Sequence, residues 1–133
     1  MQASLFLILL GTMTVTGVSR LPPAPVHEVK LVHHGDHYGF EPSTLTVHSG
    51  DRVKFTLVSG GPHNVAFDAD QIPDAPEQAL AAGMPDQMAP LAGNLLNDGE
   101  SYTISFAGVP PGTYPYFCMP HAGAGMKGSI TVE

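Results

Sequence analysis

Three potential metal-donor side chains stand in one short stretch, Tyr116-Phe117-Cys118-Met119-Pro120-His121-Ala122-Gly123-Ala124-Gly125-Met126-Lys127-Gly128. Cys118 and His121 are three residues apart, and Met126 follows five residues later. A tight, glycine-rich turn can fold this spacing around a single ion. A thiolate, an imidazole and a thioether together suit a soft transition metal.

A site of this kind needs one more nitrogen donor. The best upstream candidate is His63, in Gly60-Gly61-Pro62-His63-Asn64-Val65-Ala66-Phe67, where a turn ends and a β-branched run begins. Two imidazoles, one thiolate and one weak thioether make copper the preferred metal. We therefore predict one copper ion held by His63, Cys118 and His121 in a trigonal plane, with Met126 as a long axial ligand.

Both segments resemble those of the small blue (type 1) copper proteins, the cupredoxins, and of the plastocyanins in particular. The Cys-x-x-His-x-x-x-x-Met spacing is similar to that of plastocyanin and pseudoazurin, and Pro62-His63-Asn64-Val65 with Phe67-Asp68 resembles the upstream ligand segment of plastocyanin. The similarity extends from Val29 to Val132 and is weak between Gln71 and Asn97.

The resemblance implies a carrier that moves single electrons between redox partners by cycling copper between Cu(I) and Cu(II), and not an enzyme. It further implies that the side chain of Asn64, a second-shell residue, ties the His63 segment to the Cys118 loop. The ring edge of His121 would reach the surface within an apolar patch. Candidate members of that patch are Pro62, Pro120, Gly123, Ala124 and Tyr38.

Alternating hydrophobic residues predict an all-β fold. In the segment from Arg52 to Val58, the side chains of Val53, Phe55 and Leu57 share one face. Phe40 to His48 is predicted as another strand, bent at Pro42-Ser43. With 15 glycines and 13 prolines marking many turns, we predict a Greek-key β-sandwich of seven or eight strands, which the resemblance makes cupredoxin-like.

The middle of the chain is the part least like a sheet, because it contains several prolines and an alanine-rich run. A short helix is expected around Ala75 to Ala82. Met84 and Met88 would lie one helical turn apart there, and we interpret them as gap-filling core residues rather than as a Cu(I) site.

The 133 residues leave room for one domain. We expect a signal peptide at 1–19, with an uncleaved membrane anchor as the alternative, then a proline-rich linker at 20–25 and a single copper-binding domain at 26–133. The mature protein is expected to be a monomer without a membrane span, in a bacterial periplasm or, in a cyanobacterial host, the thylakoid lumen. Its single cysteine, Cys118, can form no intramolecular disulfide, so burial and copper would protect the thiol.

The distribution of charged residues along the chain indicates what kind of protein partner it could bind. Between Phe55 and Met126 there is no lysine or arginine but there are seven acids, Asp68, Asp70, Asp74, Glu77, Asp86, Asp98 and Glu100. The formal net charge is −7, and we expect no nucleic-acid partner. We predict docking with a basic redox protein such as a c-type cytochrome, with generic solubilising charge as the alternative.

Two other functions compete with electron transfer. A copper-binding or copper-trafficking protein of the cell envelope could use His33, His34 and His37, but Gly35 and Asp36 mark an exposed turn there and the role of these histidines stays open. A relative of multicopper oxidases or nitrite reductases would have histidines beside its cysteine, whereas Cys118 is flanked by Phe117 and Met119.

Overall fold

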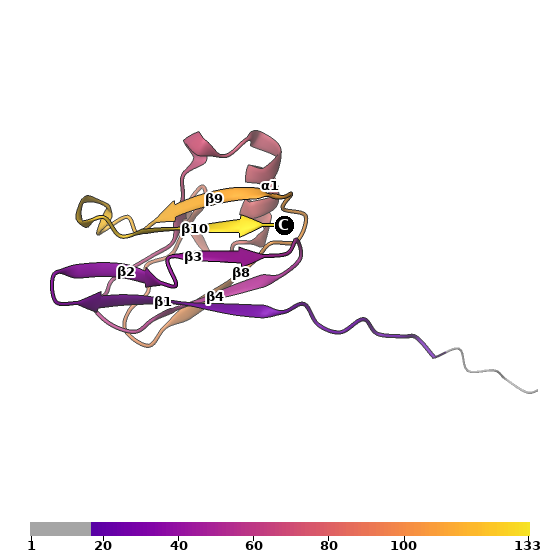
Figure 1. Ribbon diagram of the computed structural model, residues 1–133, viewed down its shortest axis with the longest axis horizontal. Helices are drawn as coiled ribbons and strands as arrows, with labels where there is room; N and C mark the ends of the chain where they lie inside the picture. Colours follow the sequence, from indigo (N-terminus) through magenta and orange to yellow (C-terminus); the bar gives the residue numbers. More distant parts are fainter. Residues whose placement is uncertain (1–16) are drawn as a thin grey trace, which may run out of the picture.

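The computed structural model describes residues 17–133, which fold as two β-sheets packed face to face with one helix at the side (Figure 1). Residues 1–16, most of the expected signal peptide, lie outside the described residues. Within residues 17–133, no helix has the length and apolar character needed to cross a bilayer. The all-β prediction is therefore confirmed for the described chain.

Ten strands form the sandwich, somewhat more than the seven or eight expected, because β5, β6 and β7 are only two or three residues long. The strands are β1 Val26–His34, β2 His37–Glu41, β3 Thr44–Val47, β4 Arg52–Leu57, β5 Ala66–Phe67, β6 Gln87–Ala89, β7 Ala92–Gly93, β8 Ser101–Ser105, β9 Gly112–Phe117 and β10 Lys127–Val132. Two short 3-10 helices, η1 Ala69–Gln71 and η2 Ala122–Ala124, and one α-helix, α1 Asp74–Gly83, complete the described elements.

The strands divide into a four-stranded sheet, ordered β2-β1-β4-β8, and a six-stranded sheet, ordered β3-β10-β9-β5-β7-β6. Strand β1 runs parallel to β4 and antiparallel to β2. Strand β10 runs parallel to β3 and antiparallel to β9. The segment that carries Cys118, His121 and Met126 therefore connects two neighbouring strands of the larger sheet, as the sequence indicated.

The single strand predicted from Phe40 to His48 is wrong in one respect. The chain forms β2 up to Glu41 and β3 from Thr44, and these two strands belong to different sheets. Pro42 and Ser43 lie at the break. A proline offers no N–H to a sheet ladder, so the bend expected at Pro42 becomes the point where the chain leaves one sheet for the other.

Aromatic rings form the centre of the core between the sheets. The ring of Tyr116 on β9 makes edge contacts with Phe40, Phe55 and Phe67, at centroid distances of 4.7, 5.6 and 5.7 Å. Phe55 lies with Val53 and Leu57 on the face of β4 that is fully buried, which confirms the alternation predicted for that strand. This core supports the ends of the strands from which the candidate metal ligands project.

Helix α1 covers the region expected to be helical, and its last residue packs against the sandwich. Leu80 and Met84 are buried, so Met84 is a core residue as predicted. Met88, in contrast, is half-exposed and lies beyond the helix in β6, so the prediction that it fills the core is wrong. At Gly83, a Cβ atom would lie 1.8 Å from the backbone carbonyl oxygen of Ser105 on β8.

We predict that Gly83→Ala destabilises the protein by about 1–3 kcal/mol, the usual cost of forcing extra volume into a packed site. The added methyl group has to displace backbone of β8, and backbone cannot move aside as a flexible side chain can. Urea denaturation monitored by circular dichroism measures the change. Gly123→Ala is the matched control, because nothing lies within 4 Å of a Cβ there. Equal stabilities for the two variants would contradict this account of α1 packing.

Candidate metal centre

His63 lies three residues before β5, in an isolated antiparallel bridge with Leu96. Its backbone N–H donates to the carbonyl oxygen of Leu96 at 3.1 Å, and its carbonyl accepts from the Leu96 N–H at 2.7 Å. The His63 side chain is completely buried. Ring atom Nε2 lies 3.0 Å from the backbone carbonyl oxygen of Ser59, and because a carbonyl only accepts, Nε2 carries the proton. The lone pair of neutral His63 is therefore on Nδ1, where it is free for a metal.

Cys118 follows the last residue of β9, and the chain folds back on itself before β10 begins. The Cys118 N–H donates to the Met126 carbonyl at 3.0 Å, and the Met126 N–H donates to the His121 carbonyl at 3.3 Å. Gly125 adopts φ +78°, the left-handed conformation that glycine accepts without cost. These bonds hold the three residues predicted as ligands within one compact turn.

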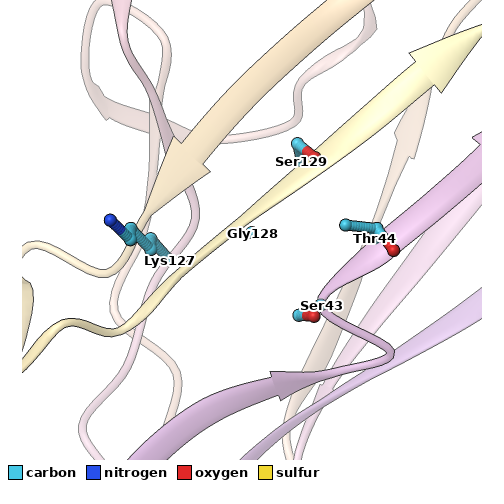
Figure 2. Close-up of a pocket in the computed structure, with 5 residues that line it drawn as sticks. All are labelled: Ser43, Thr44, Lys127, Gly128 and Ser129. Atoms are coloured by element: carbon cyan, nitrogen blue, oxygen red, sulfur yellow. The ribbon is translucent and has the colours of Figure 1, made fainter.

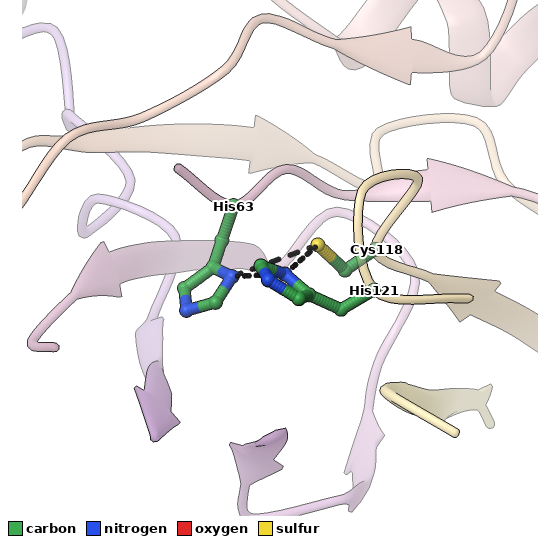
Figure 3. A group of neighbouring side chains, drawn as sticks. All are labelled: His63, Cys118 and His121. Carbon is green, nitrogen blue, oxygen red and sulfur yellow. Dashed lines mark hydrogen bonds between the residues drawn. The ribbon is translucent and has the colours of Figure 1, made fainter. Parts of the chain in front are cut away.

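The donor atoms of the two segments meet in the structure (Figure 3). Nδ1 of His63 and Nδ1 of His121 are 3.0 Å apart. The Cys118 sulfur lies 3.7 Å from the first nitrogen and 3.6 Å from the second. Imidazole nitrogen and thiolate sulfur bind a first-row metal at about 2.0–2.3 Å, so donors separated by these distances can all reach one ion. Among residues 17–133, this is the group of three His, Cys, Asp or Glu side chains that could hold a metal.

Burial sets the protonation of two of these donors in the absence of metal. Desolvation lowers the pKa of His63, so its imidazole is neutral and able to coordinate. Desolvation raises the pKa of the Cys118 thiol, so the thiol keeps its proton until a metal displaces it. A buried neutral imidazole beside a buried thiol is a donor pair that fits a thiophilic ion such as copper.

Met126 is also completely buried, on the inward side of the turn that the sequence predicted. Its backbone bonds to Cys118 and His121 place the residue in the same turn as those two donors. All four predicted ligands are therefore brought to one end of the sandwich.

Asn64 links the two ligand segments. Its side-chain oxygen accepts from the backbone N–H of Met119 at 2.8 Å, and its Nδ2 donates to the carbonyl of Gly93 at 3.1 Å. The Asn64 side chain is completely buried. Asn64, which follows His63, is thereby hydrogen-bonded both to Met119, which follows Cys118, and to Gly93 of β7.

Sequence patterns did not reveal Ser59 as a group that touches an imidazole ring, whereas Tyr38 was expected in the patch around His121 and does contact that ring. The structure also divides the three histidines considered as a cluster. His33 is half-buried on the side of β1 that faces Tyr38, whereas His34 and His37 are exposed and pair with each other at the end of the β1–β2 hairpin. His34 lies 3.5 Å from Glu41.

A surface pocket lies where β3 and β10 meet (Figure 2). Its lining residues are Ser43, Thr44, Lys127, Gly128 and Ser129. No predicted ligand lines it, so the metal centre is formed by the buried turns and not by this depression.

Comparison with known proteins agrees with this geometry. Residues 27–133 match the model of a family described as copper binding proteins, plastocyanin/azurin family. A plastocyanin of Scenedesmus fuscus is 44% identical over 95 residues, which are 71% of this chain and 86% of that protein.

Solved structures show the same relationship. The oxidised plastocyanin of Dryopteris crassirhizoma is 34% identical, with a TM-score of 0.62 over 80% of this chain and 99% of that one. A copper-containing nitrite reductase from Thermus scotoductus SA-01 is 26% identical with a TM-score of 0.59, covering 90% of this chain but only 25% of the enzyme. The chain belongs to the plastocyanin/azurin family of copper binding proteins.

Proposed function

We propose that this protein carries single electrons between redox partners, with one copper ion bound by His63, Cys118, His121 and Met126. The convergence of two imidazole nitrogens and one thiol sulfur within 3.7 Å carries the proposal. Bound copper would supply the chemistry, a change between Cu(I) and Cu(II) by one electron. The chain would hold the ion, shield it from water and leave the edge of one ligand within reach of a partner.

Three of the four proposed ligands keep water out. His63, Cys118 and Met126 are completely buried, while His121 is partly exposed. An electron can therefore enter or leave through the His121 ring without opening the site. Pro62, Pro120, Gly123 and Ala124 are exposed, and their small or apolar side chains would let a partner approach that ring closely.

A rigid ligand set is needed because copper changes charge at each transfer, and any movement of the ligands adds to the barrier. We propose that Asn64 contributes this rigidity from the second shell, since its side chain joins the His63 segment to Met119 beside Cys118. Copper trafficking is less favoured, because buried ligands cannot easily be exchanged. A catalytic role is less favoured because Phe117 and Met119, and not histidines, flank Cys118.

We infer that the protein is exported and acts in a periplasm or a thylakoid lumen, with 1–19 as its signal peptide, 20–25 as linker and 26–133 as the functional domain. In such an oxidising compartment, burial and copper ligation would protect the free thiol of Cys118 from oxidation. Asp68, Asp70 and Asp74, which lie in and beside η1 and at the start of α1, would attract a basic partner such as a c-type cytochrome.

The first of three predictions about the proposed function tests the thiolate. The purified protein should bind one copper and show an intense blue band when oxidised, and Cys118→Ser should abolish that band. Visible absorption and metal analysis measure both properties. A Cys118→Ser variant that stayed intensely blue would remove the thiolate from the proposal, and a colourless wild-type protein that binds only Cu(I) would favour trafficking.

The second prediction concerns Met126 as a weak axial ligand. Met126→Leu should keep the blue colour and raise the reduction potential, because loss of a donor disfavours Cu(II) more than Cu(I), whereas Met126→Gln should lower it. Protein-film voltammetry measures the potential. Met84→Leu, at a buried methionine of the core, is the control and should leave the potential unchanged. Met126 would not be a ligand if both of its variants matched this control.

The third prediction concerns electrostatic docking. Electron transfer to a basic c-type cytochrome should slow as salt rises. At low salt, where electrostatic steering raises the association rate by about 10- to 1,000-fold, it should also slow in the triple variant Asp68→Asn, Asp70→Asn, Asp74→Asn. Stopped-flow spectroscopy measures the rate. The control variant Glu28→Gln, Glu41→Gln, Glu133→Gln removes the same charge from other elements. Equal slowing by both triple variants would show that net charge, and not this acidic segment, governs docking.

A further inference from the structure

The β1–β2 hairpin presents two aromatic side chains to the metal centre. His33 and Tyr38 are direct cross-strand partners, and their rings are stacked with centroids 4.1 Å apart and planes at 12°. Both residues are half-buried. Tyr38 is thus fixed on one side by a ring from its own hairpin.

The opposite face of Tyr38 lies against a proposed copper ligand. Its ring is stacked on His121 at a centroid distance of 4.0 Å and an angle of 15°, and its edge meets His63 at 5.9 Å and 78°. In the described chain, no protein group hydrogen-bonds Nε2 of His121. Stacking on Tyr38 is therefore the contact that sets the plane of the His121 ring from the hairpin side.

A second link joins the same hairpin to the other imidazole. The Ser59 hydroxyl accepts from the backbone N–H of His33 at 3.0 Å and donates to the His33 carbonyl at 3.3 Å. The carbonyl of Ser59 accepts from Nε2 of His63 at 3.0 Å. Fixing Ser59 to β1 consequently fixes the acceptor that orients the His63 ring.

Close packing prevents this arrangement from shifting. Gly60 adopts φ +79°, and a Cβ atom there would lie 2.2 Å from Cβ of His33. Only a residue without a side chain lets the turn after Ser59 approach β1 this closely. The hairpin and the turn before His63 are therefore interlocked at His33.

We propose that Tyr38 and Ser59 are positioning residues for the two copper imidazoles, each through its contact with His33: Tyr38 orients His121 by stacking, and Ser59 orients His63 through its backbone carbonyl. This inference rests on the proposed function, because it assigns the groups that keep the ligand geometry constant between the two copper charges. Tyr38 contacts the ring of His33 whereas Ser59 bonds its backbone, so each restraint can be removed alone.

The test uses nuclear magnetic resonance relaxation of the histidine ring signals in the full chain loaded with Cu(I), which is diamagnetic, and in the metal-free full chain. Tyr38→Leu should increase ring motion at His121 and leave His63 as in wild type. Ser59→Ala should do the reverse. Tyr38→Phe keeps the stacked ring and should behave as wild type. His33→Leu removes the ring that stacks on Tyr38 and should loosen His121, whereas His33→Phe keeps a stacked ring there and should not.

Electron self-exchange of the copper-loaded protein gives a second readout. Tyr38→Leu should slow it, because a His121 ring that has lost its stacking partner adds ligand movement to each transfer, while Tyr38→Phe keeps the stacked ring and should not. Unchanged ring motion in both Tyr38→Leu and Ser59→Ala would overturn the inference, as would equal loosening of both rings in every variant. If the wild-type protein failed to turn blue while the separate ring responses were observed, the proposed function would fail and the inference would stand.

Discussion

The metal centre depends on the pairing of β5 with β9. Ala66 pairs with Phe117 and Phe67 with Tyr116, so the register of this pair fixes how His63, three residues before Ala66, stands relative to Cys118, the residue after Phe117. A slip of one residue would exchange the two faces of β9 and turn Tyr116 out of the core. The distance between nitrogen and sulfur is therefore set by the same contacts that bury the aromatic centre of the sandwich.

Burial keeps the Cys118 thiol protonated and the His63 imidazole unprotonated, and a single metal ion could bind both groups. A buried thiol resists losing its proton, and a buried imidazole resists gaining one. Without metal, Cys118 is therefore an unreactive thiol beside a neutral His63. On metal binding, Cys118 would give up its proton and ligate as a thiolate, and the neutral His63 would offer its Nδ1 lone pair. The enclosure that buries Cys118 would also keep water from a bound ion.

The sequence was sufficient for features that depend on local spacing. The turn containing Cys118, His121 and Met126, the buried face of Val53, Phe55 and Leu57, and a helix near Ala75 could all be predicted from periodicity and residue chemistry. Features that depend on how distant strands align could not. The change of sheet at Pro42 and the half-exposed position of Met88 follow from tertiary packing. The contact of Ser59 with His63 and the stacking of Tyr38 on His33 follow from the alignment of β1 with β2 and with the turn after β4, whereas the resemblance had already placed Tyr38 near His121. No local pattern indicates that an isolated serine orients an imidazole.

In the proposed function, attraction of a partner and passage of an electron would use different parts of the protein. The acids at Asp68, Asp70 and Asp74 lie in and beside η1 and at the start of α1, whereas the exposed edge of the metal centre lies at His121 in the turn between β9 and β10. Charges act through solvent over a Debye length of about 8 Å at physiological salt, so they can steer a partner without touching it. Electron transfer requires close contact with the ligand ring, which suits a surface of small and apolar residues. Because these demands fall on different elements, the acidic segment can adapt to a new partner while the hydrogen bonds and stacked rings that hold His63 and His121 stay as they are.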